Sequence, residues 1–226
     1  VQFPRPLPRY TSEFALVETF LDGEPISSFM NCGDTDFMKA ISDKGTASIL
    51  KMIFDDNLVH GDLHPGNILV RRVPGDPVPV ISYLDAGIVT EMDRNVHKQL
   101  VDICLAFLKR DGYLAGKLMV EYTDSDELPL HAEAFCKGVQ KMQEDALEDD
   151  YFEKFGEYWA TTCGLACDHR VKINSKFLAV GLALRVVEGV NLALDPTLDV
   201  VTAAIPVAAR SQMRYLRNDA MDSAKR

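Results

Sequence analysis

The sequence predicts a mainly helical α+β domain that carries one small β-hairpin. Apolar residues recur at helical spacing through most of the chain after residue 93. Two short runs rich in β-branched residues, 68–70 and 78–84, flank a Pro-Gly-Asp-Pro turn at 74–77, which predicts the hairpin. An apolar fraction of 47% over 226 residues is ample for a hydrophobic core.

The first quarter of the chain is expected to hold an extended lead-in, a strand and a helical stretch. Prolines recur within residues 1–10, a composition that favours extended backbone. The apolar run at 14–17 predicts a short buried strand that passes into a turn at 18–23. Apolar residues at helical spacing over 35–56 predict one helix, or two if Gly45 interrupts the pattern.

The chain after the hairpin predicts five helices joined by short polar or proline-containing links. Their expected ranges are 93–110, 112–122, 131–156, 174–193 and 197–216. The apolar stripes on these helices are typical of core packing. Within the hairpin, Pro79 lacks a backbone N–H and should place its strand at a sheet edge.

Charge and cysteine usage exclude some classes of protein. A net charge of −10 argues against nucleic-acid binding, which needs clustered Lys and Arg. No run of about 20 apolar residues lacks charges, so no transmembrane helix is expected, although contact with a membrane surface stays open. The chain starts at Val1, so any targeting peptide would lie upstream.

The five cysteines do not resemble a disulfide framework and fit a reducing compartment. Cys163, Cys167 and His169 form a loose cluster, but it lacks the second pair of ligands that a zinc site needs. We therefore expect buried, inert thiols.

The segment HGDLHPGN at 60–67 and the triplet DAG at 85–87 carry the strongest chemical signal. Asp62 is followed five residues later by Asn67, and Asp85 comes after the hairpin. An antiparallel pair returns its two ends to the same side of the sheet, so Asn67 and Asp85 should lie close together. Carboxylate and amide oxygens are the ligands that Mg²⁺ takes in phosphoryl-transfer sites. The pattern therefore predicts such a site.

The two histidines of this segment suggest a second interpretation, a zinc site. His60 and His64 are four residues apart, but Gly61, Pro65 and Gly66 disfavour a helix, and the glutamate of zinc proteases is absent. We expect His60 to be buried and to hydrogen-bond the backbone of the loop.

Three stretches resemble the UbiB/ADCK (aarF-domain-containing) family of atypical kinases. They are VHGDLHPGNILV, LDAGIV and, much later, LRVVEGVNLALDPTLDV. Aminoglycoside and choline kinase-like enzymes have nearly the same first stretch, whereas the last is more specific to UbiB/ADCK. The resemblance spans roughly residues 3–210.

The resemblance implies a protein-kinase-like C-lobe that lacks most of the N-lobe. Residues 1–23 would be the end of the N-lobe strand and the hinge, 24–216 the helical C-lobe and 217–226 a polar tail. The cofactors would be ATP and Mg²⁺. Asp62 resembles the acid of the catalytic loop, and Asn67 and Asp85 resemble the metal ligands.

The hinge would bind the adenine of the nucleotide through backbone groups. By resemblance, these groups belong to Glu18, Thr19 and Phe20. The lysine and the phosphate-covering loop of a kinase N-lobe do not precede this hinge in the sequence, so the fragment alone should bind nucleotide weakly.

The chain departs from regulated protein kinases at three places. Gly61 replaces the usual Arg, so the guanidinium that would bind a phosphate on the activation loop is missing. Ala86 replaces the usual Phe between the acid and the glycine, and no A-P-E follows Asp85. Regulation by loop phosphorylation is therefore not expected.

The resemblance further implies a role in ubiquinone biosynthesis and mitochondrial lipid homeostasis, with mitochondrial localisation if the source is eukaryotic. Implied partners are a nucleotide, a lipid or quinone precursor, a membrane surface and a biosynthetic complex, but no nucleic acid. Two alternatives stay open: a small-molecule phosphotransferase of the aminoglycoside or choline kinase type, and a pseudokinase scaffold.

Overall fold

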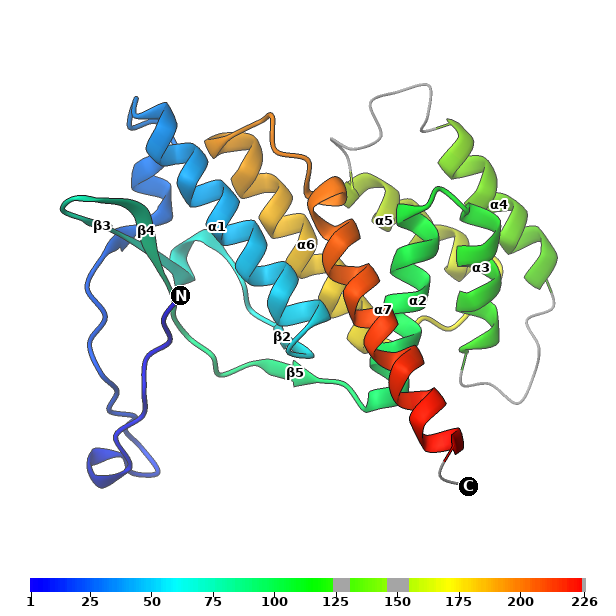
Figure 1. Ribbon diagram of the computed structural model, residues 1–226, viewed down its shortest axis with the longest axis horizontal. Coiled ribbons are helices and arrows are strands. Elements are labelled where there is room, and N and C mark those ends of the chain that lie inside the picture. The colour runs from blue at the N-terminus through cyan, green and yellow to red at the C-terminus, as the bar shows by residue number, and fades with distance from the viewer. Residues whose placement is uncertain (124–130, 146–154, 225–226) are drawn as a thin grey trace.

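The computed structural model describes residues 1–123, 131–145 and 155–224, and it is mainly helical with two small antiparallel sheets (Figure 1). The described helices are α1 (Thr35–Phe54), α2 (Arg94–Leu108), α3 (Gly112–Glu121), α4 (Ala132–Asp145), α5 (Phe155–Asp168), α6 (Ser175–Leu194) and α7 (Val200–Ala224). The strands are β1 (Glu24–Pro25), β2 (Leu58–His60), β3 (Ile68–Val73), β4 (Asp76–Tyr83) and β5 (Val89–Glu91). The predicted fold class is thus confirmed.

The predicted hairpin is formed by β3 and β4. The two strands pair in register at Val70 and Ile81, and Gly75 takes a positive φ of 79° in the turn between them. The order β1-β3-β4 places β4 at the end of the sheet, which confirms the edge position expected from Pro79. A second, two-stranded sheet joins β2 to β5.

The outer side of β4 is partly covered. The N–H of Gln2 donates to the carbonyl of Ile81, and the N–H of Tyr83 donates to the carbonyl of Gln2. The Lys44 ammonium, from α1, donates to the carbonyl of Pro79 at 2.7 Å. These contacts satisfy the carbonyls of Pro79 and Ile81 and the N–H of Tyr83 on the side that faces away from β3.

Helix α1 is a single helix and forms the centre of the molecule, beside the hairpin on one side and α6 and α7 on the other (Figure 1). Its N-terminus is capped by the Asp34 carboxylate, which accepts a hydrogen bond from the N–H of Phe37 and pairs with Arg72 at 2.9 Å. These contacts lower the pKa of Asp34, with the backbone hydrogen bond as the larger cause. Gly45 lies where α1 approaches Ile81 of β4.

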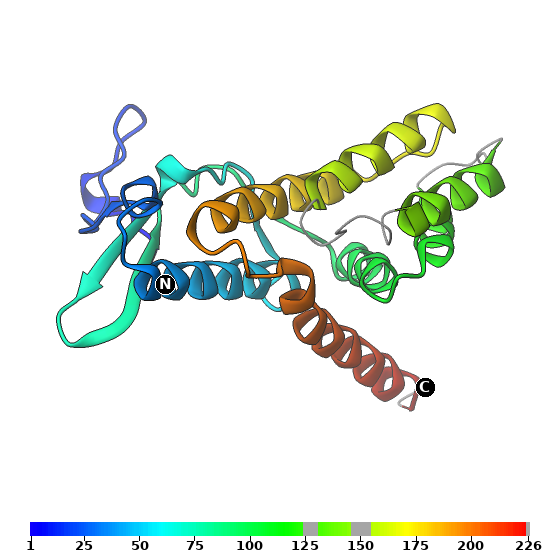
Figure 2. The same cartoon turned by 90° about the horizontal axis from the view of Figure 1, so that it is seen from above.

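Helix α6 lies side by side with α1 in both views (Figures 1 and 2). A buried polar contact joins them: the Ser42 hydroxyl donates to the side-chain oxygen of Asn191, and the Asn191 amide donates to the Thr46 hydroxyl, each at 2.8 Å. By length and composition alone α6 could cross a membrane, but half of its apolar stretch is buried in the structure. Core helices of soluble proteins meet the same criterion.

Helix α7 docks on α1 and α2 through a fully buried histidine. Nδ1 of His97 lies 2.5 Å from the Tyr215 hydroxyl, and Nε2 lies 2.7 Å from the carbonyl of Ile53. Since the carbonyl can only accept, Nε2 carries the proton and Nδ1 accepts from Tyr215. Burial lowers the pKa of His97, partly offset by the Ile53 hydrogen bond; Arg214 lowers it further and Asp55 raises it.

The helix predictions were confirmed with two corrections. Helix α5 was not predicted, because the pattern was expected to end at residue 156, whereas α5 covers Phe155–Asp168. Helix α7 continues eight residues beyond its expected end at 216. Residues 146–154, in the expected helix 131–156, lie outside the described residues.

The predicted strand at 14–17 was wrong. The side chain of Phe14 is 93% exposed, and the segment forms only an isolated bridge between Ser12 and Ala15. The apolar run predicts burial, but none of the described elements covers Phe14 or Leu16. Figure 1 shows the first residues as an open loop beside the hairpin.

Candidate functional site

The candidate site is built from two adjacent loops. The first connects β2 to β3 and contains Asp62 and the short 3-10 turn Pro65–Asn67. The second, residues 84–88, connects β4 to β5 and contains Asp85. Because β2 pairs with β5 and β3 pairs with β4, each loop joins the same two sheets. This topology is what brings the loops together.

The side chain of His60 connects the two loops through hydrogen bonds to the backbone of each. Its side chain is 5% exposed; Nδ1 accepts from the N–H of Asp62 at 3.3 Å, and Nε2 lies 3.1 Å from the carbonyl of Leu84. The proton must therefore be on Nε2, which donates to Leu84. The expectation that His60 is buried and bonds the loop backbone is confirmed.

Gly61 is required by a close approach of the two loops. Its N–H donates to the carbonyl of Ile88 at 2.7 Å. A Cβ at position 61 would lie 2.6 Å from Cγ2 of Ile88 and 3.1 Å from its carbonyl oxygen. Any side chain here would force Ile88 to shift, which gives a physical reason for the absence of the kinase arginine.

Asn67 is oriented by hydrogen bonds on three sides. Its side-chain Nδ2 donates to the carbonyl of Asp62 at 3.1 Å, and its own N–H donates to the carbonyl of His64. Its carbonyl accepts from the N–H of Leu84 at 2.8 Å, immediately before Asp85. With the amide nitrogen used within the loop, the amide oxygen is the atom that can bind a cation.

Asp85 takes a left-handed backbone conformation with φ of 49°. Aspartate tolerates this region better than most residues, but it remains uncommon outside glycine. The side chain is exposed, and Oδ1 accepts a long hydrogen bond of 3.4 Å from the N–H of Gly87. Strained backbone of this kind is concentrated at functional sites.

The structure thus joins the loops that carry Asp62, Asn67 and Asp85. It does not join them to the predicted hinge: among the described residues no hydrogen bond connects 18–20 to either loop. Instead Thr19 exchanges two hydrogen bonds of 2.9 Å with Arg5, and the Phe20 side chain is 89% exposed.

The donor set of the two loops fits a hard cation. Asp85 offers a carboxylate and Asn67 an amide oxygen, the ligand types that Mg²⁺ takes with phosphate oxygens and water. The described residues contain no group of three His, Cys, Asp or Glu placed to hold a metal by themselves. A cation here would therefore also need ligands from a phosphate or from water.

The cysteine cluster differs from its expected burial. Cys167 is exposed and Cys163 is half-buried, and the two lie one turn apart on the same face of α5. Burial raises the pKa of Cys163, and the nearby Cys167 adds to the increase. His169 packs instead against the rings of His131 and Phe135.

Two contributors to the site were missed from the sequence. Leu84 and Ile88 act through their backbone carbonyls, which the side-chain pattern does not reveal. The contact with Ile88 had a signal in the sequence, namely Gly61, because a glycine in a loop often marks a close approach of another part of the backbone.

The connection between Asp85 and α2 is as short as the sequence predicts. Only the short strand β5 and a few residues separate Asp85 from α2, which begins at Arg94. Ala86 is exposed. Between Asp85 and Arg94 the chain therefore has little room for a peptide-binding platform.

Comparison with known proteins identifies the family. A model of the ABC1 atypical kinase-like domain matches residues 1–119. A mitochondrial ABC1 family protein of Schizosaccharomyces pombe is 27% identical over 91% of this chain and 36% of its own length.

Two further relatives have kinase names. A probable serine/threonine-protein kinase of Dictyostelium discoideum is 23% identical over 96% of this chain and 41% of its own. A probable protein kinase UbiB of Yersinia pestis is 28% identical over 87% of this chain and 36% of its own. The chain thus spans about two-fifths of the length of these relatives. It belongs to the ABC1 atypical kinase-like family, also called UbiB/ADCK.

Proposed function

We propose that the chain supplies the metal-binding half of a Mg²⁺-ATP site in an atypical kinase or ATPase. Asp85 and Asn67 would hold Mg²⁺, and Asp62 would face the group that accepts the phosphoryl. The backbone of Glu18, Thr19 and Phe20 would bind adenine. When bound, Mg²⁺ would neutralise charge on the phosphates.

The observation that carries the proposal is the set of hydrogen bonds between the two loops, two of them backbone–backbone and one from the His60 ring. Gly61 to Ile88, His60 to Leu84 and Asn67 to Leu84 fix the relative position of the loops before any ligand is present. Phosphoryl-transfer enzymes depend mainly on such positioning and on charge stabilisation. Membership of the family supports nucleotide use in general.

The acceptor is proposed to be a small molecule, a lipid or water rather than a peptide. The short connection from Asp85 to α2 supports this, because it leaves no segment of the kind that binds a peptide in protein kinases. We extend the proposal to ubiquinone biosynthesis and mitochondrial lipid homeostasis, at a membrane surface or within a biosynthetic complex. The names of the UbiB and mitochondrial relatives support that extension.

The experiment is Mg²⁺-dependent ATP binding and hydrolysis by this chain, alone and joined to the upstream part of a relative such as the Schizosaccharomyces pombe ABC1 family protein. The variants are Asp85→Asn and Asp62→Asn, with Asp43→Asn on the exposed face of α1 as the matched control. Asparagine tolerates the left-handed conformation, so Asp85→Asn changes the charge at position 85 without adding backbone strain.

We expect Asp85→Asn to weaken Mg²⁺-ATP binding by at least about tenfold, since a charge-assisted metal contact is lost. Asp62→Asn should reduce turnover with little effect on binding, and Asp43→Asn should change neither. If Asp85→Asn leaves binding intact, the metal assignment is wrong. If it abolishes binding in a protein that never turns over, the pseudokinase scaffold is the better description.

A further inference from the structure

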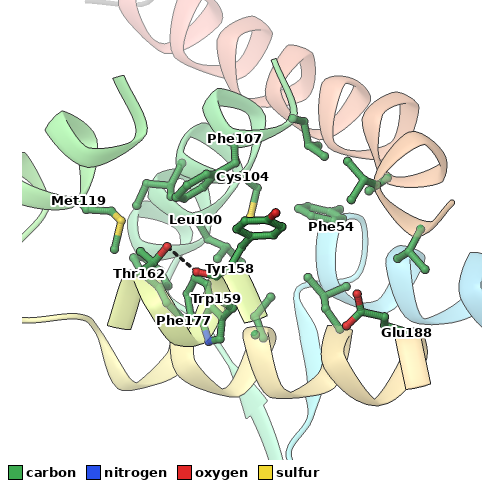
Figure 3. A pocket seen from close by; sticks show the side chains of 18 residues that line it. Phe54, Leu100, Cys104, Phe107, Met119, Tyr158, Trp159, Thr162, Phe177 and Glu188 are labelled. Atoms are coloured by element: carbon green, nitrogen blue, oxygen red, sulfur yellow. Dashed lines mark hydrogen bonds between the residues drawn. The ribbon is translucent and has the colours of Figure 1, made fainter. Parts of the chain in front are cut away.

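A cavity of about 80 Å³ lies among the helices, apart from the two loops of the candidate site (Figure 3). Helices α1, α2, α3, α5, α6 and α7 all contribute to its wall. Side chains that line it include Phe54, Leu100, Phe107, Phe177, Leu184 and Ala204. The described wall contains no Lys or Arg and a single carboxylate, that of Glu188.

The polar atoms of the wall are largely turned away from the cavity. The Thr162 hydroxyl donates to the carbonyl of Tyr158 at 2.8 Å, drawn as the dashed line in Figure 3, so its donor is used within α5. Burial raises the pKa of the Cys104 thiol to about 12, so this side chain stays neutral. A water molecule needs two to four polar partners, so such a space does not hold water well.

Trp159 forms part of the cavity wall and packs closely against Gly181 of α6. Its indole lies directly on α6, where a Cβ at position 181 would be only 2.1 Å from Nε1. Gly181 therefore allows the ring to lie against the helix. Trp159 is the chain's one tryptophan and lines the cavity, so its fluorescence reports on this site alone.

Glu188 gives the cavity a polar end. Figure 3 shows its carboxylate on the opposite side of the cavity from Met119 and Thr162. A carboxylate has about four lone-pair positions, so it can accept a hydrogen bond from a ligand in addition to its other interactions. Ligand sites of this type combine an apolar wall with few polar groups that fix orientation.

We propose that this cavity binds one end of an aliphatic chain that carries a hydroxyl group, with the hydroxyl donating to Glu188. The hydrocarbon replaces empty apolar space, which favours its transfer from water. A hydrogen bond to the Glu188 side chain selects a donor end over an end that can only accept. The volume of about 80 Å³ holds only the hydroxyl end of such a chain, and the rest of the chain would leave through the open side of the cavity.

The test is titration of the 226-residue chain with octanol, followed by the emission of Trp159 and by the thermal unfolding midpoint. We expect a saturable change in emission and a rise in the midpoint, because a ligand that binds only the folded state stabilises it. Absence of a saturable change up to the solubility limit of octanol would overturn the proposal.

A filling substitution locates the site. Ala204→Leu extends a buried wall residue into the cavity and should weaken octanol binding by about tenfold or more. Ala193→Leu makes the same change at an exposed position of α6 and should leave binding unchanged. If Ala204→Leu unfolds the chain, the midpoint shift and the ether comparison below still decide the matter. Equal affinity in a folded Ala204→Leu variant would contradict the assignment.

A second comparison tests the orientation. Methyl octyl ether has the same chain but no donor, so octanol should bind about tenfold more tightly than the ether. Glu188→Met keeps the length of the side chain and removes the acceptor, so it should reduce this ratio toward one. A ratio that stays the same in Glu188→Met would exclude Glu188 as the partner. Asp85→Asn should bind octanol normally, so this proposal can fail independently of the nucleotide site.

Discussion

Gly61→Ala should destabilise the protein by separating the two loops of the candidate site. The added Cβ would lie 2.6 Å from Cγ2 of Ile88, whereas carbon atoms in contact are about 3.5–4.0 Å apart. Ile88 must therefore shift by about 1 Å relative to position 61, which also strains the hydrogen bond from Gly61 to the Ile88 carbonyl. Overpacking of this size costs about 1–3 kcal/mol.

The assay is urea unfolding followed by circular dichroism, combined with a double-mutant cycle. Ile88 is 61% exposed, so Ile88→Ala alone should change the free energy of unfolding by less than about 1 kcal/mol. In the double variant the clash with Cγ2 is gone, and more than half of the loss should be recovered. The carbonyl contact at 3.1 Å remains and prevents full recovery.

Gly45→Ala is the matched control, with the opposite expected sign. Its Cβ would meet Cδ1 of Ile81 at 3.7 Å, an ordinary contact, and alanine is favoured over glycine within a helix by about 0.5–1 kcal/mol. If Gly61→Ala were as stable as the unmodified chain, or if Ile88→Ala gave no rescue, the close approach described here would be wrong.

Three further outcomes are expected. Burial holds the pKa of His97 below 6.5, so the contacts of its neutral form stabilise the fold above about pH 6.5, and this contribution is lost as the pH falls below that value. The free energy of unfolding, measured from pH 7.5 to 5, should therefore depend less on pH in His97→Gln than in the unmodified chain. Gly181→Ala should lower stability by about 1–3 kcal/mol and shift the emission of Trp159, because the new methyl displaces the indole; an unchanged spectrum would contradict the packing. Cys104 is half-buried and its pKa is raised to about 12 by desolvation, so it should react with iodoacetamide only when the chain unfolds, as mass spectrometry of peptides would show; labelling in the native state at neutral pH would contradict the raised pKa.

Local signals in the sequence were sufficient for the hairpin and for most helices. The β3–β4 pair was marked by a proline- and glycine-containing turn between β-branched runs, and Pro79 correctly indicated an edge. Helix α5 was missed because Gly156 and Gly164, together with several Thr and Cys residues, weaken its helical pattern. Propensity is a weak guide where tertiary packing against α4 and α6 supplies the stability.

The candidate site divides in the same way. The spacing of Asp62, Asn67 and Asp85 predicted loops that meet, and the strand pairing brings those loops together. The left-handed backbone of Asp85 and the carbonyl of Ile88 could not be predicted, because neither depends on a side-chain pattern. The strand predicted at 14–17 was wrong for a different reason: an apolar run alone does not show whether another element packs on it, and Phe14 is exposed.

The covered edge of β4 protects the protein from association through its sheet. An exposed edge strand presents unpaired N–H and C=O groups that can recruit a strand from another molecule. Here Pro77 and Pro79 offer no N–H, Lys44 occupies the carbonyl of Pro79, and Gln2 pairs with the last part of the strand. The hairpin therefore ends in a surface that is poorly suited to add another strand, even though its sheet has only three strands.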